Sequence, residues 1–328
     1  MDSDIVIHIF FESRNKWLER NKTLKNRLDC VRFLEDEDSI NSIINELINA
    51  GFQVFDYEIN TIKISDSFDK IQNTKNSIIW NLTDGNGLYK GSNIPAVASL
   101  SGIPYIGSGS YVQMLAQNKY HMKNIVNSYG IPIAESINIC TDEELIPEIS
   151  FPPPYFIKPT CFDNGIGDQD VFPICDNIEE IKMAMRTFRE INISHALVEE
   201  FLPNDEYSVV MINGGKWTAE CVKLIYDSPF WDSAKKDQCR YSIEVVSDKI
   251  AQYMIDASLL LAKNLDILDY FRVDFRCDKY GVPKFLELNT NPFLMCKSYN
   301  FVANKFFHSW AMMLRSMVIQ SFSRQHHK

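Results

Sequence analysis

Hydrophobic and polar residues alternate between strand-like and helix-like spacing over the first part of the chain. Residues 4–11 form a short apolar run that is typical of a buried strand. From Asp38 to Ala50 apolar residues recur every three or four positions, which predicts an amphipathic helix, and Gly51 is expected to end it. Strand-like runs return at 52–57 and 77–82. This alternation predicts an α/β unit with an open sheet.

The rest of the chain mixes the same two patterns. A helix that carries Lys119 and Lys123 is expected after repeated turns, strands are expected at 155–158 and 196–201, and an amphipathic helix at 306–321. The predicted fold class is therefore α/β. We expect three parts: an N-terminal α/β domain at 1–113, a central unit at 114–201 and a C-terminal unit at 202–328.

The polar pattern that says most about chemistry lies at residues 271–292. It predicts two strands joined by a tight turn at 278–281. A symmetric turn places Arg272 opposite Glu287 and Asp274 opposite Phe285. Because side chains alternate between the faces of a strand, one face of the hairpin is expected to be mostly polar and the other apolar.

The expected polar face brings two carboxylates and an amide together. It carries Arg272, Asp274, Glu287 and Asn289, whereas the apolar face carries Val273, Phe275, Leu286 and Leu288. At an effective dielectric near 20 and a separation of roughly 7 Å, two carboxylates repel each other by about 2 kcal/mol. A hard divalent cation removes this repulsion, and Mg2+ binds carboxylate and amide oxygens while also bridging phosphates. The hairpin therefore predicts half of a nucleotide–metal site.

Composition narrows the class of protein. A chain of 328 residues is long enough for more than one hydrophobic core, and the net charge of -10 argues against nonspecific nucleic-acid binding. The N-terminus lacks the pattern of a signal peptide, and no apolar run is long enough to span a bilayer. The eight cysteines form no Cys-x-x-Cys pair, so we expect free thiols, no zinc site and a cytoplasmic location.

Two further segments suggest contacts with a nucleotide. Residues 155–167 predict a strand with Lys158, followed by a loop at Gly165, Ile166 and Gly167 whose backbone could approach phosphates. Residues 196–206 predict an apolar strand that runs into acidic residues, where backbone groups could bind a base and a carboxylate could bind ribose. Either segment alone is equally typical of a solvated surface loop.

The order of these features resembles the ATP-grasp ligases, and most closely the D-alanine–D-alanine ligase group. The resemblance extends from Trp80 to Pro292, and its most specific parts are Arg-Val-Asp-Phe and Leu-Glu-Leu-Asn-Thr-Asn-Pro. It implies an ATP-grasp fold, in which an N-terminal open α/β domain precedes two subdomains that sandwich ATP. It also implies ATP and two Mg2+ ions as cofactors, with Mn2+ as a substitute, and a homodimer.

The resemblance assigns roles to individual residues. Those implied to hold the nucleotide are Lys119, Lys158, Gly165, Ile166 and Gly167 at the phosphates, Glu199, Glu200, Phe201 and Leu202 at adenine, and Glu206 at ribose. Asp274 and Glu287 are implied to bind one Mg2+, and Glu287 with Asn289 the second. Those implied to act in catalysis or on the second substrate are Arg272, one of the loop residues Lys235 and Lys236, and Ser298.

The implied reaction passes through an acyl phosphate. A carboxylate attacks the γ-phosphoryl group of ATP, and an amine then attacks the activated carbonyl. Cations are needed because both steps concentrate negative charge. The implied partners are ATP and small amino-acid or other carboxylate and amine substrates, with no nucleic acid and no membrane.

Several positions depart from the pattern of the resembled group. Phe162-Asp-Asn-Gly165 replaces an acidic, serine-containing loop, Phe293 stands where a glycine is usual, and residues 84–90 lack the usual His-Gly motif. Glu12 lies near the position of a substrate-binding carboxylate but is expected to be exposed. We therefore expect substrates other than two D-alanines. A D-alanine–D-alanine ligase with altered loops and a noncatalytic nucleotide-binding protein remain the alternatives.

Overall fold

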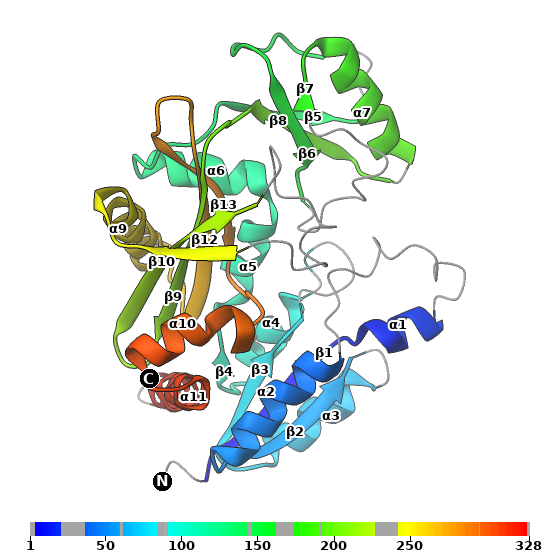
Figure 1. Cartoon of the computed structure of the whole chain (residues 1–328). Coiled ribbons are helices and arrows are strands. Elements are labelled where there is room, and N and C mark those ends of the chain that lie inside the picture. The colour runs from blue at the N-terminus through cyan, green and yellow to red at the C-terminus, as the bar shows by residue number, and fades with distance from the viewer. Residues whose placement is uncertain are drawn as a thin grey trace.

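The described part of the computed structural model contains three β-sheets that follow one another along the chain (Figure 1). The structure describes residues 4–20, 37–59, 62–83, 89, 91–142, 146–161, 174–190, 192–226, 242–294 and 296–326. In the described part of the chain, no helix is long and apolar enough to cross a membrane. The α/β fold class is confirmed, while the boundaries between the three parts stay a prediction.

The N-terminal sheet is parallel and has the strand order β2-β1-β3-β4. Its strands are β1 (Val6–Phe11), β2 (Gln53–Glu58), β3 (Ser77–Asn81) and β4 (Tyr105–Ile106). Its helices are α1 (Arg14–Arg20), α2 (Glu37–Asn49), α3 (Ile64–Gln72) and α4 (Asn93–Leu100). The predicted helix end is confirmed, because Gly51 has a φ of 92° and its N–H donates to the Ile48 carbonyl at 2.9 Å.

The central sheet is antiparallel and has the order β5-β8-β6-β7. It is formed by β5 (Ser136–Cys140), β6 (Tyr155–Pro159), β7 (Ile174–Cys175) and β8 (His195–Glu200). Helix α7 (Ile178–Glu190) buries Ile181 and Phe188 against it. The strands predicted at 155–158 and 196–201 are thus neighbours, which brings Lys158 and Glu199 to adjacent strands.

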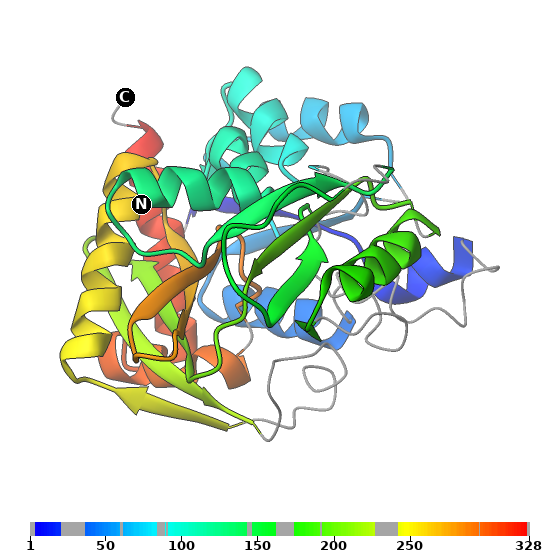
Figure 2. The same cartoon turned by 90° about the horizontal axis from the view of Figure 1, so that it is seen from above.

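The C-terminal sheet is antiparallel and has the order β11-β10-β9-β12-β13. Its strands are β9 (Glu206–Asn213), β10 (Trp217–Ile225), β11 (Ser242–Val246), β12 (Tyr270–Cys277) and β13 (Pro283–Asn289). One face packs against helices α5 (Ser110–Gln117), α6 (Lys119–Ser128) and α9 (Lys249–Asn264). Figure 2, seen from above, shows this unit beside the central sheet.

Two C-terminal helices connect the C-terminal sheet to the N-terminal one. They are α10 (Cys296–Phe306) and α11 (Trp310–His326). Met313 and Met317 of α11 share one core with Ile7 of β1 and Ile212 of β9. The helix predicted at 306–321 therefore begins and ends later than expected. His308 has a left-handed φ of 67° and separates the two helices.

The register of the β12–β13 hairpin differs from the symmetric prediction. Asp274 lies opposite Glu287 and Arg272 lies opposite Asn289, two residues from the predicted partners. One residue of this difference is already present beside the turn, and a β-bulge between Asp274 and Phe275 adds the other. Phe275 pairs with Phe285, so Leu286 is the extra residue of the bulge. The expected pairing of Asp274 with Phe285 was wrong. The turn itself is confirmed, since the Gly281 N–H donates to the Asp278 carbonyl at 2.9 Å.

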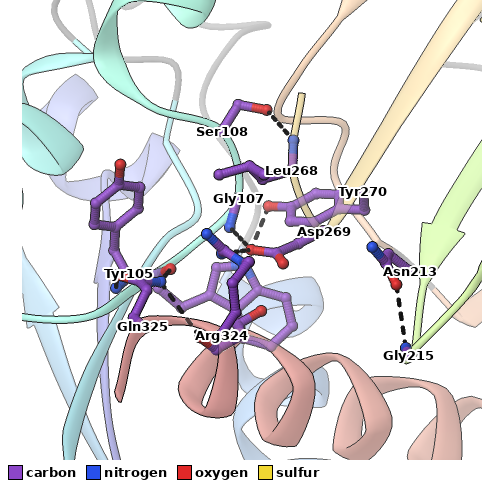
Figure 3. Close-up of polar contacts among 12 residues, drawn as sticks. Tyr105, Gly107, Ser108, Asn213, Gly215, Leu268, Asp269, Tyr270, Arg324 and Gln325 are labelled. Atoms are coloured by element: carbon purple, nitrogen blue, oxygen red, sulfur yellow. Dashed lines mark hydrogen bonds and ion pairs between the residues drawn. The ribbon is translucent and has the colours of Figure 1, made fainter. Parts of the chain in front are cut away.

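A buried carboxylate holds distant segments together near the C-terminus (Figure 3). Asp269 precedes β12 and is 1% exposed. Its Oδ2 accepts from the Gly107 N–H at 2.7 Å and pairs with Arg324 Nη2 of α11 at 2.8 Å. The neighbouring Gln325 side chain donates to the Tyr105 carbonyl at 2.6 Å and accepts from the Tyr105 N–H at 3.0 Å. Burial raises the pKa of Asp269, and Arg324 opposes that rise.

We expect Arg324→Met to lower the free energy of unfolding by about 3 kcal/mol or more, because it leaves the Asp269 carboxylate buried without its cation. The double variant Asp269→Leu/Arg324→Met should recover much of this loss. Urea denaturation measures both, with Arg186→Met on the exposed face of α7 as the control. A change within about 0.5 kcal/mol for Arg324→Met, which is the usual range for a surface substitution, would contradict this assignment.

A second prediction concerns His8, which is buried in β1. Ser77 Oγ donates its hydrogen to the Thr74 carbonyl, so it accepts from His8 Nε2 at 3.0 Å. The other ring nitrogen, His8 Nδ1, then accepts from the Tyr57 hydroxyl at 3.1 Å. The neutral ring is therefore satisfied. Burial lowers the pKa of His8 from 6.5 to about 4.

The unfolded chain accordingly binds more protons than the folded one between these two pKa values. The stability contribution is complete above pH 6.5 and is lost as the pH falls toward 4, with a total on the order of 3 kcal/mol. His8→Gln should flatten the pH dependence of the free energy of unfolding between pH 7 and pH 4.5. Equal pH dependence in the variant and the parent chain, measured by urea denaturation, would show that His8 does not titrate in this way.

Candidate nucleotide and metal site

The bulge in the β12–β13 hairpin places two carboxylates directly across from each other. Asp274 is 6% exposed, and its pairing partner Glu287 is half-buried. Arg272 forms a two-pronged ion pair with Asp274, with Nε 2.9 Å from Oδ1 and Nη2 2.8 Å from Oδ2. Ser208 Oγ on β9 donates to Asp274 Oδ1 at 2.6 Å. Burial alone would lower the pKa of Arg272, but Asp274 raises it above its usual value.

The oxygen donors on this face fit a hard divalent cation. Asp274 and Glu287 supply carboxylates, and Asn289 supplies an amide oxygen two positions beyond Glu287 on the same strand face. Asn289 Oδ1 is held by the Asn291 N–H at 3.0 Å. Within the described residues there is no cluster of three or more His, Cys, Asp or Glu side chains that could hold a metal, because one of the three expected donors is an amide.

Lys119 approaches the hairpin from the start of helix α6. The side chain of Asn118 caps this helix by accepting from the His121 N–H at 2.9 Å. The Lys119 N–H donates to the Thr160 carbonyl at 2.9 Å, which attaches the helix start to the end of β6. Lys119 is 5% exposed, and its Nζ lies 3.7 Å from Glu287 Oε2. The structure thus joins a predicted phosphate contact to a predicted metal ligand.

Glu199 lies between two lysines at the edge of the same region. Its carboxylate is 2% exposed, with Oε1 2.6 Å from Lys158 Nζ and Oε2 3.2 Å from Lys123 Nζ. Burial would raise the pKa of Glu199, but the two ammonium groups overcome this and lower it. Glu199 is therefore ionised and fixed by two cations. The sequence pattern predicts Lys123 on this helix but gives it no role.

Glu206 begins strand β9 and belongs to a second polar group. Its Oε2 accepts from the Tyr226 hydroxyl at 2.7 Å and lies 3.5 Å from Arg276 Nη1. Arg276 lies over the Phe201 ring, 5.7 Å from its centroid, and is 8% exposed. Arg276 was not among the predicted site residues, although it lies two residues after Asp274 and strand alternation places both on one face.

The other predicted adenine contacts lie next to Glu199. The Glu200 N–H donates to the Glu135 carbonyl at 2.9 Å and the Phe201 N–H to the Pro154 carbonyl at 3.2 Å, while Leu202 is buried. Gly165, Ile166, Gly167, Lys235 and Lys236 lie outside the described residues. Ser298 lies in helix α10, and its side chain also lies outside the described part.

The expectation that Glu12 is exposed was wrong. Glu12 is 1% exposed and accepts from Thr83 Oγ1 at 3.3 Å. The reason is topological, because β1 and β3 are parallel neighbours and the segments that follow them leave the sheet at the same edge. A carboxylate that directly follows a fully buried strand stays buried there.

The end of the hairpin motif contacts this edge of the N-terminal sheet. Tyr270 donates through its hydroxyl to Asn291 Oδ1 at 2.7 Å and accepts from the Trp80 indole at 3.1 Å. Asn291 Nδ2 donates to the Thr83 carbonyl at 3.5 Å. Phe293, two residues later, is half-buried and packs against the core shared by β1 and α11.

Comparison with known proteins adds to this geometry. Residues 126–306 match the family model described as "D-ala D-ala ligase C-terminus". A D-alanine–D-alanine ligase of Lacticaseibacillus casei is 27% identical over 216 residues, which span 64% of this chain and 58% of that protein. The chain thus spans a little over half the length of this curated relative.

Solved structures share the fold over nearly the whole chain. A D-alanine–D-alanine ligase from Bacillus anthracis, solved with ATP, superposes with a TM-score of 0.73 at 18% identity, covering 98% of this chain and 99% of the other. A D-Ala:D-Ser ligase from Enterococcus faecalis gives a TM-score of 0.71 at 16% identity, with 97% and 99% covered. At these identities the structures show the fold alone.

Proposed function

Because the chain belongs to the D-Ala–D-Ala ligase C-terminus family and has the fold of its ATP-grasp ligases, we propose that it joins a carboxylate to an amine on amino-acid substrates other than two D-alanines. The chain is an ATP-dependent ligase that forms C–N bonds. The observation that carries the ligase activity is the polar face of the hairpin, where Arg272, Asp274 and Glu287 meet Lys119.

The nucleotide would lie between the central and C-terminal sheets. Lys119 and Lys158 each form an ion pair there, with Glu287 and Glu199 respectively. Their ammonium groups would contact ATP phosphates. Glu199 with the backbone of 200–202 would hold adenine, and Glu206 would hold ribose. Gly165, Ile166 and Gly167, together with Lys235 or Lys236, are proposed to complete the phosphate contacts.

Arg272 would stabilise the charge that develops during transfer. Its guanidinium is held rigidly by Asp274, so it needs little reorganisation when negative charge builds up beside it. Asp274, Glu287 and Asn289 would hold two Mg2+ ions, which supply electrostatic neutralisation of the phosphates. The attacking carboxylate takes the γ-phosphoryl group and leaves ADP, and the amine then displaces phosphate from the acyl phosphate.

The proposal of different substrates depends on residues away from the nucleotide. Phe293 places an aromatic ring immediately after the motif, where the resembled ligases usually have glycine, and this ring packs into the core. A backbone approach that needs glycine is therefore closed or reshaped there. The fold itself is compatible with more than one amine, since a D-Ala:D-Ser ligase shares it. Ser298 is proposed to contact the carboxylate of the second substrate.

Two other functions compete with this one. A D-alanine–D-alanine ligase is favoured by the names of the family and of the curated relative. A noncatalytic nucleotide-binding protein would share the fold, but it gains nothing from the paired carboxylates of the hairpin. Homodimer formation and a cytoplasmic location stay predictions.

We expect the protein to release ADP in the presence of ATP, Mg2+ and an amino-acid pair that differs from D-alanine alone. A coupled assay of ADP release across a panel of D- and L-amino acids, singly and in pairs, measures this. Mass spectrometry should find the condensed product in the same reaction. Strong and selective turnover with D-alanine alone would support the D-alanine–D-alanine ligase instead.

A second experiment separates an enzyme from a binding protein. Asp274→Asn and Glu287→Gln should each lower kcat by about 100-fold or more, because each removes negative charge from the proposed metal-binding face. Glu244→Gln is the matched control, since this exposed carboxylate lies on the far edge strand β11 of the same sheet. Nucleotide binding by the parent protein with no turnover on any panel member would favour the binding protein.

A further inference from the structure

Helix α6 lies at the junction of the central and C-terminal sheets (Figures 1 and 2). It contacts β13 of one sheet and β5 of the other. Lys119 and Lys123 are four residues apart on this helix, so their side chains lie on the same face. Lys119 approaches Glu287, whereas Lys123 approaches Glu199. One face of helix α6 therefore contacts both halves of the proposed site.

Lys123 is unusual because its side chain is completely buried. Its Nζ lies 3.2 Å from Glu199 Oε2 and donates to the Phe285 carbonyl at 3.0 Å, with the Phe285 ring centroid 6.0 Å away. Phe285 lies on β13, next to the bulge that sets the position of Glu287. One ammonium group thus connects strand β8 of the central sheet with strand β13 of the C-terminal sheet.

Glu199 pairs with two lysines that differ in their exposure to solvent. Lys158 pairs with Oε1 and Lys123 with Oε2, so the two lysines share one carboxylate. Lys158 is 18% exposed and can reach a ligand, whereas Lys123 cannot, since it has no exposed surface. Burial lowers the pKa of Lys123 to about 8, so the charged form still predominates at neutral pH.

We propose that Lys123 is a positioning residue for ATP, acting through Glu199 on Lys158 and through the Phe285 carbonyl on strand β13. The inference rests on the proposed function, because it takes the region between these strands as the nucleotide site. Lys123 touches no ligand itself. It fixes the Glu199 carboxylate, and that carboxylate in turn fixes the Lys158 ammonium at the phosphates and the adjoining backbone at the base.

The experiment is a double-mutant cycle read out by binding. The dissociation constant for an ATP analogue that cannot be hydrolysed, with Mg2+, is measured by calorimetry for the parent, Lys123→Met, Lys158→Met and the double variant. Lys123→Met should weaken binding by about 10-fold or more, as losses of supporting contacts do. In the Lys158→Met background the same substitution should weaken binding by less than about 3-fold, because part of its effect passes through Lys158.

Equal effects of Lys123→Met in the two backgrounds, or no effect in the parent background, would overturn the proposal. Arg324→Met is the matched control for lost stability. It also removes the cation of a buried ion pair, but at the distant Asp269, and it should leave the dissociation constant unchanged. A parent protein that binds no ATP analogue would instead overturn the proposed function, so the two failures are distinguishable.

If Lys123→Met fails to fold, Lys123→Met/Glu199→Gln replaces it, because this pair of substitutions leaves no uncompensated buried charge. It is compared with Glu199→Gln alone, in which Lys123 can still donate to the Phe285 carbonyl. Weaker binding by the double variant supports positioning through β13, and equal binding overturns that part of the proposal.

Discussion

Three carboxylates, those of Asp274, Glu287 and Glu199, lie in one largely buried region, and the structure depends on pairing each of them with a cation. Asp274 has Arg272 from its own strand, Glu287 has Lys119 from helix α6, and Glu199 has Lys158 and Lys123 from β6 and α6. Removing buried charges from water is expensive unless they are paired closely. The pairs of Glu287 and Glu199 close only when α6 and the central and C-terminal sheets are assembled, so this charge pairing ties the site to the tertiary fold.

The sequence predicted the two strands of the hairpin and their polar face, but not the register in which the strands pair. Alternation placed Arg272, Asp274, Glu287 and Asn289 on one hairpin face. It could not reveal the bulge at Leu286, because an apolar residue at that position is compatible with either register. The bulge matters physically, since it moves Phe285 from the polar face into the core and leaves Glu287 directly opposite Asp274.

Local sequence patterns also could not predict contacts between residues that lie far apart in the chain. Lys123 and Arg276 gave only weak cues, namely helical spacing from Lys119 and strand spacing from Asp274. Their partners lie 76 and 70 residues away, at Glu199 and Glu206. Glu12 was misjudged for the same reason, because its burial depends on the pairing of β1 with β3 and on Thr83 rather than on its neighbours in sequence.

Two positions that depart from the resembled ligases, Glu12 and Phe293, lie near the same part of the N-terminal sheet. Asn291 hydrogen-bonds both Tyr270 and the Thr83 carbonyl, while Thr83 donates to the buried Glu12. Phe293 follows two residues later and packs against the core beside β1. A polar chain therefore connects the end of the hairpin motif to the edge of the N-terminal sheet. The paired charges around Lys119, Lys158 and Asp274 involve other side chains, so this edge can vary without disturbing them. Under the proposed function, a change confined to that edge would alter which amino acids fit, while the residues proposed to bind ATP and metal would keep their contacts.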